Sequence, residues 1–125
     1  MQKIFHCLWI AKYAFSFYWN CISAYTVNAI ESTALDTLLL TLVVTDNDAD
    51  AVITFAPETS VPSVFVLSET DGTIRLVDQL DRETTTDYEF NVEATDGSTI
   101  VTATVSIIVD DDNDNIPVFN PTNYK

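Results

Sequence analysis

The chain has 125 residues, enough for one domain, and 47% of them are hydrophobic, so a single buried core can form. The formal net charge is −14 and all 19 acidic residues lie from Glu31 onward, a surface that repels phosphate and excludes nucleic acid as a partner. The single histidine and both cysteines lie in the first 21 residues, so the remainder has no Ser/His/Asp or Cys/His catalytic group, disulfide or zinc site.

The first 23 residues differ from everything that follows. They contain Lys3, an apolar and aromatic-rich run, and small residues near Cys21 and Ser23, which is the pattern of a secretory signal peptide cleaved after Ser23. Lys12 interrupts the apolar run and disfavours membrane insertion. Two alternatives are a membrane-anchoring helix, for which the apolar stretch is short, and an artefact of gene prediction without a structural role.

From residue 25 the sequence has a period of two. In residues 88–94, apolar side chains alternate with Glu89, Asn91 and Glu93, and residues 103–109 alternate in the same way. Such alternation is typical of strands with one buried and one wet face. We predict seven strands, in chain order at residues 26–30, 38–45, 52–55, 64–67, 73–76, 88–94 and 103–109.

Turn residues separate these strands. Asp71–Gly72 and Asp96–Gly97 are pairs that favour turns with a positive φ. No segment has a convincing helical period. Seven short strands without a cysteine pair predict an all-β fold, a seven-stranded Greek-key β-sandwich of immunoglobulin-like type.

The acidic residues fall at the ends of the predicted strands. Strands in a sandwich run up and down, so their ends gather at two poles, and carboxylates at the poles are what a cation shared between domains requires. The residues concerned are Glu31, Asp46, Asp48, Asp50, Asp81, Glu83, Asp96 and the run from Asp110 to Asn115.

Calcium suits these groups better than other metals. It accepts about 6–8 oxygen ligands in irregular geometry, whereas magnesium requires octahedral order and zinc prefers nitrogen or sulfur. The ion would also neutralise the repulsion between neighbouring carboxylates. An EF-hand is excluded, because a loop starting at Asp46 has Ala51 in place of the required glycine and Pro57 in place of the final glutamate.

Six motifs follow one another in a fixed order over about residues 25–119. They are a glutamate after the first strand (Glu31), DxD (Asp46 to Asp48), ETDGTIRL (residues 69–76), LDRE (Leu80 to Glu83), ATD (Ala94 to Asp96) and DxNDNxPxF (Asp111 to Phe119). Together they resemble the motifs of a cadherin repeat, and the resemblance predicts a sandwich of the cadherin type.

The resemblance also implies roles for individual residues, all of them at the two poles. Asp111 begins its motif but is not usually a ligand in the family, so it is left out of the predicted set. At one pole the implied side-chain ligands are Glu31, Asp81, Glu83, Asn113 and Asp114, with backbone carbonyls from Asp112 and Asn115. At the other pole Asp46, Asp48 and Asp96 match positions that complete the sites of a preceding repeat.

The DxD loop departs from the family pattern. The family usually has a glycine and an asparagine after DxD, but Asp48 is followed directly by Ala49, Asp50 and Ala51, so the loop is shorter. Asp50 is a candidate substitute for the asparagine. Residues 24–30, at the start of the expected mature chain, contain no tryptophan of the kind that strand-swapping members dock near the mature N-terminus, so strand swapping is not expected.

The implied function is calcium-dependent cell adhesion without enzymatic activity. Ca²⁺ would stiffen the joints between neighbouring repeats of an extracellular, plasma-membrane-associated molecule, which would bind another cadherin on the apposed cell. We expect a leader at 1–23, the domain at 24–119 and the start of a next repeat at 120–125. The alternatives are a hydrolase that uses paired carboxylates, such as Asp81 with Glu83 or Asp46 with Asp48, and a truncated, non-adhesive fragment.

Overall fold

The computed structural model describes residues 23–44, 46, 50–113 and 117, so the expected leader lies outside the described residues except for Ser23. The described part of the chain is all strand and loop, and it contains no helix that could cross a membrane. Its strands are β1 (Ser23–Ile30), β2 (Leu38–Thr41), β3 (Thr54–Pro57), β4 (Phe65–Leu67), β5 (Thr73–Leu76), β6 (Asp87–Thr95) and β7 (Ile100–Asp110).

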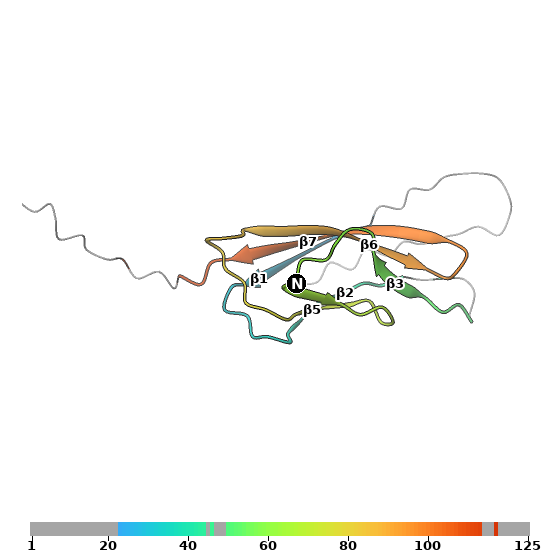
Figure 1. Ribbon diagram of the computed structural model, residues 1–125, viewed down its shortest axis with the longest axis horizontal. Coiled ribbons are helices and arrows are strands. Elements are labelled where there is room, and N and C mark those ends of the chain that lie inside the picture. The colour runs from blue at the N-terminus through green and yellow to red at the C-terminus, as the bar shows by residue number, and fades with distance from the viewer. Residues whose placement is uncertain (1–22, 45, 47–49, 114–116, 118–125) are drawn as a thin grey trace, which may run out of the picture.

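These strands form two sheets. One sheet has the order β1-β7-β6-β3 and the other has the order β2-β5-β4 (Figure 1). β1 runs parallel to β7, while the other neighbouring pairs are antiparallel. This architecture confirms the predicted seven-stranded, immunoglobulin-like β-sandwich.

The core lies between the sheets and follows the predicted alternation. In β6 the side chains of Phe90 and Val92 are buried while Glu89 is exposed, and in β7 Val105 and Ile107 have no exposed surface. Aromatic rings fill the space beside them. The ring of Phe65 in β4 lies 6.2 Å from that of Phe90 in a stacked arrangement, and 5.1 Å from that of Tyr88 in an edge-on arrangement.

Several strand ends differ from the prediction, among them those of β2, β3 and β7. β2 ends at Thr41 and not at residue 45, because the backbone amide of Leu42 donates to the carbonyl of Gly72 and the carbonyl of Val43 accepts from the Tyr25 hydroxyl. β3 covers Thr54–Pro57, so it begins and ends two residues later than the predicted stretch at 52–55. β7 begins at Ile100, whose backbone pairs with β6 although its side chain is 62% exposed.

Both predicted Asp-Gly turns contain glycine with a positive φ. Gly72 has φ 65° and Gly97 has φ 95°. Gly72 also lies directly against the ring of Phe55, because a Cβ built there would be 2.7 Å from the Phe55 Cζ atom. At this position the backbone conformation and the packing both require glycine.

Because β1 and β7 are parallel, both strands finish at the same end of the sandwich, and the two ends differ. We call the end where both strands finish, at Ile30 and Asp110, the lower pole, and the opposite end, where β6 finishes at Thr95, the upper pole. Figure 1 shows the arrows of β1 and β7 pointing toward the same end of the molecule. The predicted carboxylate residues that the structure describes divide between these two poles.

Candidate metal centre

The end of β1 and the end of β7 bring distant acidic residues together at the lower pole. Ile30 is paired with Asp110 in the last register of the two strands, and the Glu31 amide donates to the Asp110 carbonyl at 3.0 Å. The next residues of each strand are therefore neighbours. This places Glu31 beside Asp111 and Asp112, although about 80 residues of chain separate them.

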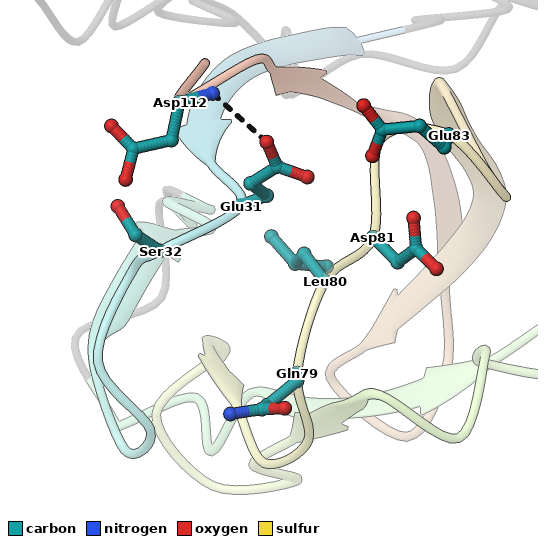
Figure 2. A pocket seen from close by; sticks show the side chains of 7 residues that line it. All are labelled: Glu31, Ser32, Gln79, Leu80, Asp81, Glu83 and Asp112. Atoms are coloured by element: carbon teal, nitrogen blue, oxygen red, sulfur yellow. Dashed lines mark hydrogen bonds between the residues drawn. The ribbon is translucent and has the colours of Figure 1, made fainter. Parts of the chain in front are cut away.

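The connection before β6 supplies the other acids of the lower pole. Leu80 is buried in the core with 5% of its surface exposed, and it holds the following residues at the rim of the sandwich. The Asp81 carbonyl accepts from the amides of Thr84 and Thr85, which turns the chain sharply. As a result Asp81 and Glu83 lie on the side of the pole opposite Ser32 and Asp112, with Glu31 between them (Figure 2).

Three carboxylates converge closely enough to hold one cation. One oxygen from each of Glu31, Glu83 and Asp111 lies within 4.8 Å of the others. Ligand oxygens lie about 2.3–2.6 Å from a calcium ion, so two of them are at most about 5 Å apart. The all-oxygen set at this spacing therefore suits a hard divalent cation. The groove beside it is lined by Glu31, Ser32, Gln79, Leu80, Asp81, Glu83 and Asp112.

Glu31 is held by backbone amides from two separate segments. Its Oε2 atom accepts from the amide of Arg82 at 2.9 Å, and its Oε1 atom accepts from the amide of Asp112 at 2.9 Å. The second of these bonds is drawn in Figure 2. An ionised carboxylate has about four lone-pair sites, so both oxygens retain room for a cation.

Asp81 is engaged within its own turn. Its carboxylate accepts from the Thr84 hydroxyl at 2.6 Å and from the Thr84 amide at 3.1 Å. These two bonds, the hydroxyl one foremost, hold the pKa of Asp81 below its ordinary value, because they stabilise the charged form. Asp81 is thus a permanent anion near neutral pH, and it lines the groove without joining the close group of three.

The residues after β7 are only partly described. The Asp112 amide binds Glu31, and the Asn113 amide donates to the Asp111 carboxylate at 2.9 Å with Asn113 at φ 52°. The positive φ turns the chain immediately after the strand, and asparagine tolerates this conformation better than most residues. Asp114 and Asn115, both expected ligands, lie outside the described residues.

The upper pole carries a second set of acids. Asp96 follows β6, where its carboxylate accepts from the amides of Ser98 and Thr99; these bonds, that of Thr99 foremost, lower the pKa of Asp96. Asp46 is half-buried and lies a few residues beyond Val43, which contacts Tyr25 near the start of β1. Asp48 lies outside the described residues.

Asp111 joins the close carboxylate group although the predicted ligand set left it out. The family pattern assigns its position no usual role, and alternation in the sequence does not reveal which strands pair. Knowledge that the first and last strands run parallel would have placed Asp111 next to Glu31. The relevant signal in the sequence was that both residues follow the end of a strand.

The chain is similar to known cadherin domains in sequence and in structure. The family model described as "Cadherin domain" matches residues 25–110. Protocadherin-15 of Mus musculus is 45% identical over 100 residues, which are 78% of this chain and 5% of that protein. The chain therefore spans a small fraction of the length of this relative.

Solved structures of cadherin domains are also similar to this chain. The crystal structure of the Protocadherin GammaB4 extracellular domain has a TM-score of 0.70 and 34% identity, and the match covers 77% of this chain and 16% of that one. The solution structure of the third cadherin domain from human protocadherin 7 has a TM-score of 0.67 and 26% identity, and it covers 86% of this chain and all (100%) of that one.

Proposed function

The chain belongs to the cadherin family, and we propose that it is a calcium-dependent cell-adhesion module. In this proposal Ca²⁺ at the lower pole joins the domain to the next repeat, and the stiffened row of repeats presents an adhesive surface to a cadherin on an apposed cell. The molecule would be extracellular and associated with the plasma membrane. The ion's contribution is mechanical, since it fixes the joint between modules.

The observation that carries this proposal is the convergence of Glu31, Glu83 and Asp111 within 4.8 Å. Like charges at this separation repel, and a divalent cation turns the repulsion into attraction. The wider proposed ligand set takes in the other acidic and amide residues of the two poles. It comprises Asp81, Asp112, Asn113, Asp114 and Asn115 at the lower pole, and Asp46, Asp48 and Asp96, shared with a preceding repeat, at the upper pole.

The second candidate function is that of a hydrolase. A glycosidase needs one carboxylic acid whose pKa is raised so that it stays protonated and can act as the general acid. The pKa of Asp81 is instead lowered by its two bonds to Thr84. This supports the role of a permanently charged cation ligand over that of a proton donor.

Calcium titration tests the proposed function. We expect amide resonances of the lower pole to shift with a dissociation constant of about 10⁻⁴ to 10⁻³ M, as for extracellular calcium modules. Glu83→Gln should weaken binding about tenfold or more, because it removes one of the three converging charges. The measurement is NMR titration of the ¹⁵N-labelled chain with CaCl₂.

Glu89→Gln is the matched control, because it removes the same charge from an exposed position within β6. This control should bind calcium like the unchanged chain. Equal affinity of the Glu83→Gln variant and the unchanged chain would remove the proposed site. Turnover of a chromogenic glycoside by the unchanged chain would instead favour the hydrolase.

A further inference from the structure

We propose that Glu31 is a positioning residue that holds the lower pole in shape before any cation binds. Its carboxylate joins the connection before β6 to the segment after β7 through the amides of Arg82 and Asp112. We call this pair of hydrogen bonds the Glu31 bridge. The bridge itself requires no ion, and only its role in presenting ligands to calcium rests on the proposed function.

Glu31 makes hydrogen bonds that join the end of β1 to the end of β7 and to the connection before β6. The Glu31 amide donates to the Asp110 carbonyl at 3.0 Å, which fixes the backbone at the end of β1 against β7. From this fixed point each carboxylate oxygen accepts from a different amide, both at 2.9 Å. Rotation of the carboxylate would break both bonds together, so the side chain is held in one orientation with Glu83 and Asp112 on opposite sides of it (Figure 2).

The two bonds together need two acceptor oxygens on one side chain, which a carboxylate supplies. Bonds from an amide to a charged acceptor are shorter and about twice as strong as neutral ones. Glutamine offers one acceptor oxygen, and its NH₂ group would meet the second amide donor to donor. Aspartate keeps the charge but is one methylene shorter, so it cannot reach the same two amides from the same backbone position.

The bridge offsets the repulsion that the neighbouring acids impose. Glu83 and Asp111 converge on Glu31, and without a cation their charges push the three segments apart. Each amide places a partial positive charge against a Glu31 oxygen and opposes this separation. The segments that carry the ligands are therefore ordered in advance, which lowers the ordering cost that calcium must overcome on binding.

Amide hydrogen exchange in EDTA tests the bridge directly. In the ¹⁵N-labelled full chain without calcium, the amides of Arg82 and Asp112 should exchange about tenfold or more slowly than their unstructured rates. Glu31→Gln and Glu31→Asp should both accelerate the exchange of at least one of these two amides about tenfold. The amides of Val92 and Val105, which lie in paired strands of the core, report whether each variant is folded.

Glu83→Gln is the matched control. It removes one charge from the same carboxylate group but leaves the acceptor of both amides in place. We expect its Arg82 and Asp112 amides to stay protected in EDTA. Equal acceleration in the Glu83→Gln and Glu31→Gln variants would overturn the bridge, because charge alone would then account for the effect. Unprotected amides in the unchanged, folded chain in EDTA would overturn it as well.

Repeating the exchange experiment with CaCl₂ distinguishes this inference from the proposed function. Protected amides in EDTA, together with no shift on adding CaCl₂, would support the bridge and contradict the calcium site. Unprotected amides in EDTA that become protected with CaCl₂ would support the site and contradict a bridge independent of the ion.

Discussion

Replacing Phe90 with alanine should lower the free energy of unfolding by about 3–5 kcal/mol, which is a large part of the total for a domain of this size. Phe90 is only 3% exposed, and its ring stacks on that of Phe65, whose edge contacts Tyr88. Truncation therefore removes burial energy and leaves a cavity between β4 and β6. The midpoint of thermal unfolding should fall by about 12 °C or more.

Urea denaturation in EDTA, followed by circular dichroism, measures this change without a contribution from calcium. The neighbouring substitution Glu89→Ala is the control, because Glu89 points to the opposite, exposed face of β6. That variant should stay within about 0.5 kcal/mol of the unchanged chain. A loss below about 1 kcal/mol for Phe90→Ala would contradict the stacked aromatic core.

Gly72→Ala should cost about 2–5 kcal/mol, although it adds only one methyl group. The left-handed backbone costs a residue with a Cβ atom about 1–2 kcal/mol, and overpacking of a filled site costs about 1–3 kcal/mol more. The new Cβ would lie 2.7–2.9 Å from three atoms of the Phe55 ring. That ring cannot easily retreat, because Phe55 is buried and its amide binds the Glu69 carbonyl at 2.8 Å.

Gly97→Ala separates the cost of the left-handed backbone from the cost of overpacking. Gly97 also has a positive φ, 95°, but a Cβ at this position would meet no atom within 4 Å. This variant should therefore show the backbone cost alone, in the same urea experiment. The double variant Gly72→Ala/Phe55→Leu should recover part of the loss, because the smaller side chain makes room for the methyl group. Equal losses for the two glycine variants would contradict the packing of Gly72 on Phe55.

The sequence predicted the fold well where burial alone sets the pattern. Phe90, Val92, Val105 and Ile107 alternate with polar neighbours, and all four are buried in the structure. Predictions were less accurate where the backbone partner decides the outcome. Ile100 belongs to β7 because β6 is long enough to pair with it, and β2 ends where Tyr25 and Gly72 take over its hydrogen bonds.

The same distinction holds for the candidate metal centre, where motifs predicted some residues and strand pairing decided the others. Glu31, Asp81 and Glu83 were singled out by their motifs, and the structure places all three at the lower pole. The presence of Asp111 in the group depends on the parallel register of β1 and β7, which no local pattern encodes. The bonds of Asp81 to Thr84, and those of Glu31 to two backbone amides, depend on side-chain geometry that spacing along the chain does not reveal.

The parallel pairing of β1 and β7 has a consequence for how the domain carries tension. A pull applied at Ser23 and at Asp110 acts on opposite ends of the pair, so the two strands are sheared along their length. The register from Ser23↔Ala103 to Ile30↔Asp110 is then loaded as a whole, whereas a peeling geometry would open one pair at a time. Resistance to such a pull is governed by the unfolding rate, so a module strung in series should yield slowly under force even where its equilibrium stability is modest.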